Sequence, residues 1–152
     1  MSKFKEGKNE EGKVMHYAVG ALIEKDGPST LLRTSQYLLI DRKLPPFGFA
    51  GIAGHVDDGE EEPEKALVRE VMEESGLKVL RYELLFEEEL KGNVCVAGVD
   101  IHFWRLYKCE VSGNIIQDKE EEKSIGWYTK EEIKNLNLEP AWQYWFKKLG
   151  VI

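Results

Sequence analysis

The segment that leads into and through a predicted helix between Pro63 and Gly76 constrains this chain more than any other part of its sequence. Proline is favoured in the first turn of a helix, and glycine is a common residue where a helix ends. Glu70, Glu73 and Glu74 recur at helical spacing, so they lie on one side of this helix. Crowded like charges destabilise a helix by about 0.2–0.5 kcal/mol per pair. A bound hard cation such as Mg²⁺ compensates for this loss, because it prefers carboxylate oxygens as ligands. The pattern therefore predicts a metal site suited to phosphate chemistry.

The other side chains of this helix predict how it docks. At about 100° per residue, an apolar face forms that can pack on a sheet, made of Leu67, Val68, Val71 and Met72. We expect the carboxylates on the opposite side, facing a cleft, with Arg69 beside them. Arg69 is expected to hold a carboxylate of the preceding loop, either Glu60 or Glu61. An ordinary amphipathic helix also exposes Glu, but one-sided carboxylates next to an Arg and a glycine-rich loop favour a site.

Composition limits the classes of function. A length of 152 residues with 42% hydrophobic residues is typical of one domain, which we place at residues 13–152 after a flexible tail at 1–12. A net charge of −7 argues against a nucleic-acid polymer or an anionic membrane as partner. The chain has no apolar run of about 18 residues and no apolar N-terminal segment, so we expect a cytoplasmic protein without a membrane span. A homodimer is compatible with the sequence.

Cysteine and histidine give no local signal. Cys95 and Cys109 match no metal-ligand spacing, so both are expected to be reduced structural residues, as in a cytosol. His55 follows a loop glycine but stands alone as a candidate metal ligand, and His16 and His102 read as ordinary strand histidines. None of these residues carries a signal for a metal site.

Hydrophobic patterning predicts a mixed α/β domain. Helices and strands do not alternate regularly, so a doubly wound parallel sheet is not expected. A loop containing four glycines is predicted over 44–59, and a turn over 26–29. The expected strands cover 14–24, 37–40, 78–90, 99–109 and 124–128, and the expected helices cover 63–75, a short segment capped by Thr129, and 141–149.

The segment from Gly54 to Leu77 resembles the Nudix box, whose second half reads Arg-Glu-apolar-x-Glu-Glu-x-Gly-apolar. Residues 69–77 match that half without exception. In the first half the chain carries one extra residue, so either Glu60 or Glu61 takes the place of the box glutamate. The approach to the box at 49–54 and the later strand-to-helix turn at 127–133 are also similar to the family.

The resemblance implies the Nudix fold, a mixed β-sheet sandwiched between α-helices. It also implies a pyrophosphohydrolase that cleaves the diphosphate linkage of a nucleoside diphosphate derivative with Mg²⁺ or Mn²⁺. Carried over by position, the metal ligands are Glu70, Glu73, Glu74 and the Ala53 carbonyl, with Arg69 as a further catalytic residue. The general base is either a box glutamate or one of the residues 120–122.

Contacts with the substrate are predicted from residue type. Arg42 and Arg105 are candidates to pair with phosphate, and Phe49 is a candidate to stack on a base. The sequence names neither the substrate nor the preferred metal.

Two alternative functions stay open at this stage. One is a non-catalytic nucleotide-sensing or protein-binding Nudix module, which the retained box carboxylates disfavour. The other is an isomerase of allylic diphosphates, which needs a Cys near the site, and neither cysteine lies in a recognisable motif.

Overall fold

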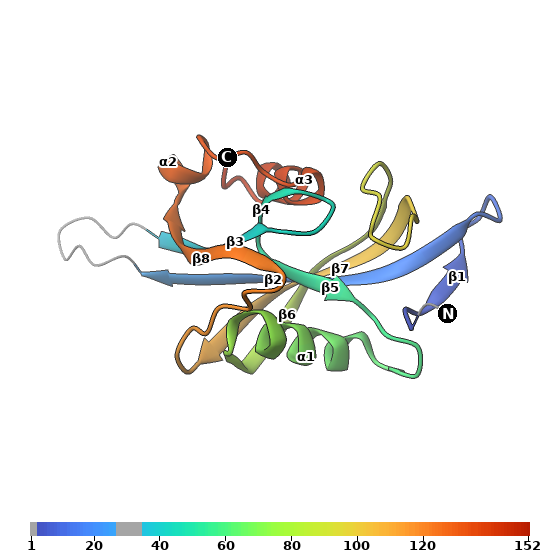
Figure 1. The fold of residues 1–152 in the computed structure, drawn as a ribbon, viewed down its shortest axis with the longest axis horizontal. Coiled ribbons are helices and arrows are strands. Elements are labelled where there is room, and N and C mark those ends of the chain that lie inside the picture. The colour runs from blue at the N-terminus through green and yellow to red at the C-terminus, as the bar shows by residue number, and fades with distance from the viewer. Residues whose placement is uncertain (1–2, 27–34) are drawn as a thin grey trace.

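A computed structural model describes residues 3–26 and 35–152 (Figure 1). The predicted turn at 26–29 lies, beyond Asp26, outside these residues. In chain order the elements are β1 (Glu6–Lys8), β2 (Val14–Asp26), β3 (Ser35–Arg42), β4 (Gly48–Ala50), β5 (Ile52–His55), α1 (Pro63–Ser75), β6 (Lys78–Leu90), β7 (Ile101–Ser112), β8 (Glu122–Thr129), α2 (Lys130–Ile133) and α3 (Pro140–Lys148).

Strand β2 is the centre of a mixed sheet with the order β4-β3-β2-β7-β6. The pairing of β2 with β7 is parallel, whereas β2 pairs antiparallel with β1, β3 and β5. β8 extends the sheet beyond β3. Because β2 pairs with β1, β3, β5 and β7, residues at different points along β2 lie next to residues of four other strands.

Helices cover both faces of this sheet. Figure 1 shows α1 on one side and α3 on the other, with α2 near α3. The predicted apolar face of α3 is confirmed, because Trp142, Trp145 and Phe146 are buried. A Cβ atom at Gly51 would overlap the Trp142 ring, so glycine lets α3 approach the β4–β5 segment closely. The expected mixed sheet between helices is confirmed.

Helix α1 begins at Pro63 and ends before Gly76, which has φ 73°, as predicted. The face it buries differs from the predicted one. Leu67 and Val71 are buried as expected, but Val68 and Met72 are 42% and 48% exposed. Ala66, Glu74 and Ser75 are buried instead. The helix therefore packs on the sheet with an arc that contains two of the three carboxylates, so the prediction that they lie opposite the packing face is wrong.

Two other predictions need correction. The segment 44–59 is not one loop, because residues 48–50 and 52–55 form β4 and β5. Residues 1–12 are not all tail, because β1 pairs with the start of β2. Both misses have the same cause: these strands are short and glycine-containing, and edge pairing with a neighbour supplies hydrogen bonds that no local pattern reveals.

The short helix after Thr129 is confirmed, with a complete capping box between Thr129 and Glu132. Within 3–26 and 35–152, no helix is both long enough and apolar enough to cross a membrane.

Candidate active site

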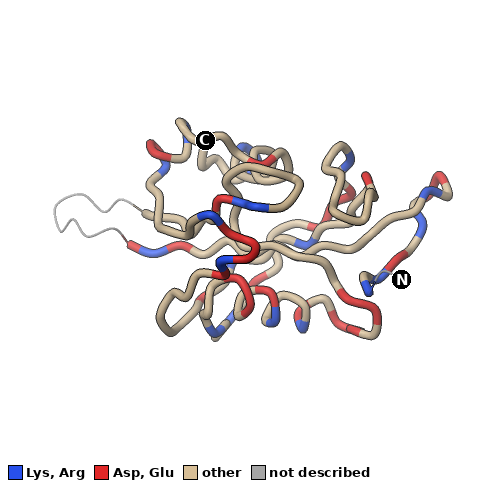
Figure 2. The backbone as a smooth tube through the Cα atoms, viewed as in Figure 1, with Lys and Arg blue, Asp and Glu red and all other residues tan. Residues whose placement is uncertain are grey.

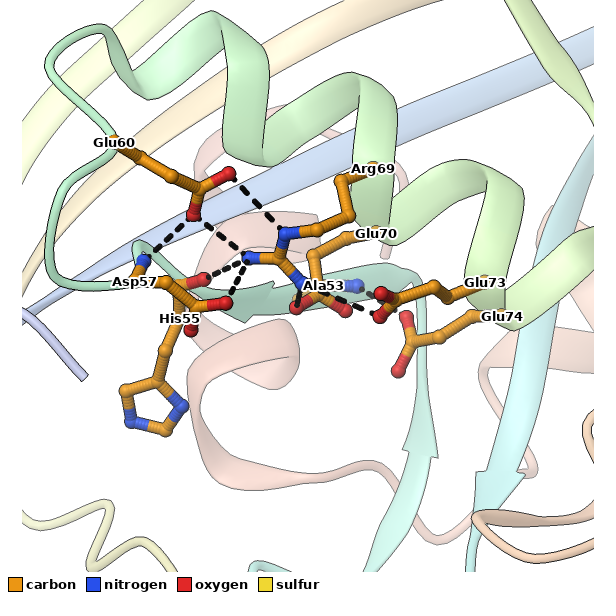
Figure 3. A network of polar contacts seen from close by, with 8 residues as sticks. All are labelled: Ala53, His55, Asp57, Glu60, Arg69, Glu70, Glu73 and Glu74. Atoms are coloured by element: carbon orange, nitrogen blue, oxygen red, sulfur yellow. Dashed lines mark hydrogen bonds and ion pairs between the residues drawn. The ribbon is translucent and has the colours of Figure 1, made fainter. Parts of the chain in front are cut away.

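The guanidinium of Arg69 is the centre of a polar network with Glu60, Glu70 and Glu73, and these residues together with Glu74 of the same helix form what we call the carboxylate site (Figure 3). Its Nη1 donates to Glu70 Oε1 at 2.7 Å and to Glu73 Oε2 at 3.2 Å. Its Nη2 donates to the carbonyl oxygen of His55 at 2.9 Å. Arg69 therefore ties the carboxylates of α1 to the end of β5, as a rigid multi-donor cation can.

Glu60, rather than Glu61, is the loop carboxylate that meets Arg69. The Arg69 Nε donates to Glu60 Oε2 at 3.2 Å, and Nη2 donates to Glu60 Oε1 at 2.9 Å, a two-point contact. The backbone N–H of Asp57 also donates to Glu60 Oε1 at 2.7 Å. Glu61 is exposed, so the extra residue in the box extends the loop after Glu60 without disturbing this contact.

Two backbone positions before α1 are shaped to its carboxylates. Gly54 leaves room for Glu70, since a Cβ atom there would overlap the Glu70 carboxyl group. The backbone N–H of Ala53 donates to Glu74 Oε2 at 3.1 Å. This bond is buried. It brings the main chain of Ala53 next to Glu74, and the Nudix resemblance implies that both residues are metal ligands. The glycine-rich segment thus serves close backbone approach.

The electrostatics of the site follow from burial. Burial raises the pKa of Glu70 to about 7, although the charge of Arg69 acts against this and those of Glu73 and Glu121 add to it. Burial and then the charge of Glu70 raise the pKa of Glu74 well above its ordinary value. Burial alone would lower the pKa of Arg69, but its hydrogen bond to Glu60 and the charge of Glu70 raise it. Arg69 therefore stays charged, and its single positive charge cannot offset the charges of all the neighbouring carboxylates.

A cleft opens in front of these residues, and we call it the carboxylate cleft. Its lining includes Arg42, Glu70, Glu73, Glu74 and Glu121. Figure 2 shows acidic stretches on α1, on the loop before it and just before β8. Of the candidate bases at 120–122, only Glu121 lines the cleft. Glu120 and Glu121 are both exposed, but Glu120 is not among the lining residues, and Glu122 is buried and accepts from the Asp118 N–H at 3.2 Å.

Not every predicted substrate contact reaches this cleft. Arg42 lines it, and its Nε donates to the carbonyl of Pro46 at 2.7 Å. Phe49 packs edge-on against Tyr128 with ring centroids 5.7 Å apart, and Arg105 pairs with Glu87 at 3.0 Å. Neither Phe49 nor Arg105 is among the described residues that line the cleft.

The structure also assembles a group that the sequence did not predict. His16, His55, Cys95 and His102, here called the histidine–cysteine cluster, place one possible ligand atom each within 4.8 Å of one another. The four residues are scattered over the chain without a ligand-like spacing, so no local signal in the sequence could have found them.

The carboxylate site fits a hard divalent cation. Its donors are carboxylate oxygens on one wall of a cleft, the ligand type that Mg²⁺ and Mn²⁺ prefer. Glu73 is more than half exposed and is held at the cleft by Arg69, while Glu74 also lines the cleft but is buried. Glu70 and Glu74 both carry a pKa raised mainly by burial, and a cation would offset that penalty.

Comparison with known proteins identifies the family and the fold. The family model described as NUDIX domain matches residues 15–149. A solved MutT NUDIX hydrolase from Burkholderia pseudomallei is 25% identical, with a TM-score of 0.70 over 86% of this chain and 94% of that one. The NUDIX domain of Shewanella oneidensis NrtR, complexed with ADP ribose, is 14% identical, with a TM-score of 0.75 over 94% of this chain and 91% of that one.

A C. elegans Ap4A hydrolase is 24% identical, with a TM-score of 0.53 over 76% of this chain and 82% of that one. The last two similarities bear on the fold alone. No curated protein matches the sequence. With residues 15–149 matched and the second half of the box intact, the chain belongs to the Nudix domain family and is a Nudix-type hydrolase of phosphoric anhydrides.

Proposed function

We propose that this hydrolase cleaves the diphosphate linkage of a nucleoside diphosphate derivative and depends on Mg²⁺ or Mn²⁺. The observation that carries the proposal is the carboxylate site, in which Arg69 holds Glu60, Glu70 and Glu73 together at the wall of a cleft. Such an arrangement lowers the stability of the fold, because it gathers like charges at positions where burial already disfavours a charge. A role in binding a cation explains why the carboxylates lie there.

The residues that would hold the cation are Glu70, Glu73, Glu74 and the carbonyl of Ala53. A bound divalent ion would supply charge neutralisation for the diphosphate oxygens and a more acidic water. The protein contributes position. The two-point contact between Glu60 and Arg69 fixes the guanidinium, and Arg69 then fixes Glu70 and Glu73 toward the cleft.

We assign the general base to Glu121. It faces the same cleft as the box carboxylates but is not one of them, so it can accept a proton from an attacking water while they hold the cation. Burial and the charge of Asp118 raise the pKa of Glu121, which moves it toward the range useful for a base at neutral pH.

Substrate recognition is assigned to Arg42. It lies in the cleft near Glu74 and Glu121, and it is the one arginine besides Arg69 among the described lining residues. Its hydrogen bond to Pro46 holds the side chain in place, which leaves its guanidinium positioned for a phosphate oxygen. The ADP ribose bound by the NrtR domain and the Ap4A named for the C. elegans enzyme are both nucleoside phosphate derivatives, the class of substrate proposed here for this chain.

A cytoplasmic location is part of the proposal, since Cys95 and Cys109 are both free thiols.

The test is a panel of nucleoside diphosphate derivatives, including sugar-linked, ribose-linked and dinucleoside compounds, assayed with Mg²⁺, Mn²⁺ or chelator. We expect release of a nucleoside monophosphate from at least one compound and loss of that release with chelator. Binding without turnover across the panel would favour the non-catalytic module instead. Turnover that persists in chelator would remove the cation from the proposal.

A further inference from the structure

The histidine–cysteine cluster is built by strand register. His16 on β2 is the direct partner of His102 on the parallel strand β7. Ala18, two residues along β2 and so on the same face, is the direct partner of His55 on β5. The three imidazoles therefore project from one face of the sheet, and their ring centroids lie 5.3–6.0 Å apart. Cys95, from the segment between β6 and β7, completes the group.

The cluster is buried and poorly satisfied. His16, Cys95 and His102 are each less than 10% exposed. Among the described residues, His55 Nε2 and His102 Nδ1 are buried without a hydrogen-bond partner. A buried polar atom without a partner typically destabilises a fold by about 1–3 kcal/mol. Two such nitrogens in one cluster are available to a ligand from outside the chain.

The chemistry of the imidazoles suits metal ligation. Burial and then the neighbouring His16 lower the pKa of His102 to about 4, so its ring is neutral and keeps a lone pair at physiological pH. His16 Nε2 lies 3.2 Å from Glu6 Oε1 on β1, and its Nδ1 lies 3.8 Å from Cys95 Sγ. If Nε2 donates to the carboxylate, Nδ1 is left as an acceptor facing the thiol. A ligating histidine commonly shows this arrangement, with its other ring nitrogen bonded to a carboxylate.

We propose that His16, His55, Cys95 and His102 bind one Zn²⁺ in a tetrahedral site. Three imidazole nitrogens and one thiolate are a Zn²⁺ ligand set, and four protein ligands complete its coordination, as in structural rather than catalytic zinc sites. At usual Zn–N and Zn–S lengths the donors would stand about 3.3–3.7 Å apart. The present separations reach 4.8 Å, so the group closes by about 1 Å on binding.

This site is distinct in chemistry from the carboxylate site and does not depend on the proposed function. A soft thiolate with imidazoles selects Zn²⁺, whereas carboxylate oxygens select Mg²⁺ or Mn²⁺. The metal would join β2, β5 and β7 to the 91–100 segment. Because His55 and Cys95 also line the carboxylate cleft, zinc would hold one wall of that cleft in place.

Cobalt substitution tests the proposal directly. The full-length protein is stripped with chelator, and Co²⁺ is added in excess Mg²⁺, which occupies the carboxylate site. We expect one Co²⁺ per chain, with the visible bands of tetrahedral coordination and a near-ultraviolet thiolate charge-transfer band. Zn²⁺ should displace it at a ratio of one per chain, measured by calorimetry and elemental analysis, and should raise the melting temperature.

Cys95→Ser should abolish the thiolate band and weaken Zn²⁺ binding by at least about 100-fold, since changes to outer-shell partners alone often cost 10–100-fold. Cys109→Ser is the matched control, because Cys109 is also a buried thiol. The thiolate band and the Zn²⁺ affinity of this variant should match those of the wild type. The chain has only two cysteines, so a thiolate band that survives Cys109→Ser comes from Cys95 even if Cys95→Ser fails to fold.

A wild-type protein that takes up no stoichiometric Zn²⁺ or Co²⁺ in Mg²⁺ overturns the proposal. So does a thiolate band that persists in Cys95→Ser or disappears in Cys109→Ser.

Discussion

The carboxylate site and the histidine–cysteine cluster meet at the same strand, β5, but they are assembled in different ways. The carboxylate site takes its acidic groups and Arg69 from residues 60–74, so one loop and one helix supply them. The cluster takes four side chains from positions 16, 55, 95 and 102, and only the pairing of β2 with β5 and β7 brings three of them together. A site on one element is visible in sequence spacing, whereas a site across strands is not.

The two regions also differ in their response to burial. The carboxylate site keeps a partly exposed face on its cleft and uses Arg69 to balance its charge. The cluster contains no Lys or Arg of its own, and burial lowers the pKa of His55 to about 3 and that of His102 to about 4, which keeps both of these imidazoles neutral. One small domain can therefore hold a site of hard ligands and a site of soft ligands next to each other, because the adjacent β5 residues Gly54 and His55 face opposite sides of the sheet, Gly54 toward Glu70 and His55 toward the cluster.

The largest expected effect is loss of turnover in Glu73→Gln and Glu74→Gln. Each change removes one carboxylate charge while keeping an oxygen, so the fold should persist and turnover should fall by at least about 100-fold. Steady-state assays with Mg²⁺ measure the fall, and circular dichroism checks the fold. Zn²⁺ binding by the cluster should be unchanged in both. Full activity in both variants would remove the metal assignment, and the two regions would no longer differ as a hard and a soft metal site.

Glu121→Gln should lower kcat by about 100-fold, at the lower end of the usual contribution of a general base. Glu120→Gln, one residue earlier and outside the cleft, is the control and should keep kcat within about twofold. The kcat–pH profile of Glu121→Gln should also lose its acidic limb. Equal rates for the two variants would place the base among the box carboxylates and confine catalysis to α1.

Glu60→Gln and Glu61→Gln separate the two glutamates of the extended box. Glu60 accepts from Arg69 and from the Asp57 N–H, whereas Glu61 is exposed. We expect Glu60→Gln to lower kcat/KM by roughly 10–100-fold, the usual cost of a changed outer-shell partner, and Glu61→Gln to have little effect. Kinetics over a range of Mg²⁺ concentrations measure this. Indistinguishable variants would show that the Arg69 network does not organise the site.

Arg42→Gln should raise KM by about tenfold, because a hydrogen bond to a charged group contributes about 1.5–3 kcal/mol. Arg105→Gln should leave KM nearly unchanged, since Arg105 pairs with Glu87 and does not line the cleft. Initial-rate measurements with the best substrate of the panel decide between them. A larger effect at Arg105 would mean that the substrate extends beyond the described cleft.

The smallest expected effect is a pH dependence of stability in metal-free protein. Glu70 has a folded-state pKa of about 7, above its ordinary value of 4.5, so the folded chain binds its proton more tightly than the unfolded chain. The free energy of unfolding should therefore fall as pH rises from about 4.5 to about 7, by roughly 1–3 kcal/mol.

Urea denaturation in chelator at several pH values measures this slope. Glu70→Gln should flatten it, and excess Mg²⁺ should reduce it in the wild type, because a cation favours the ionised carboxylate. A slope that is the same in Glu70→Gln would assign the effect to other buried acids, such as Glu122, whose pKa burial also raises to about 7.

Several parts of the fold can be predicted from local sequence patterns. The boundaries of α1, the capping box at Thr129 and the buried aromatic face of α3 were predicted because caps and helical periodicity lie within a few residues of each other. The strands β1, β4 and β5 were missed because each is short and depends on a partner elsewhere in the chain. The exposure of Val68 and Met72 was missed because the sheet, not the apolar stripe alone, decides which arc of α1 is covered.

The sequence by itself determined the family, the helix that carries the carboxylates and the residue types able to hold a hard cation, since all of these are encoded by spacing along one segment. Only the tertiary structure decided that Glu60 rather than Glu61 meets Arg69, that Glu74 is buried, and that Phe49 and Arg105 lie away from the cleft. It alone brought His16, His55, Cys95 and His102 together. The physical reason is that side-chain neighbours across strands are set by register and chain crossing, which link residues far apart in sequence.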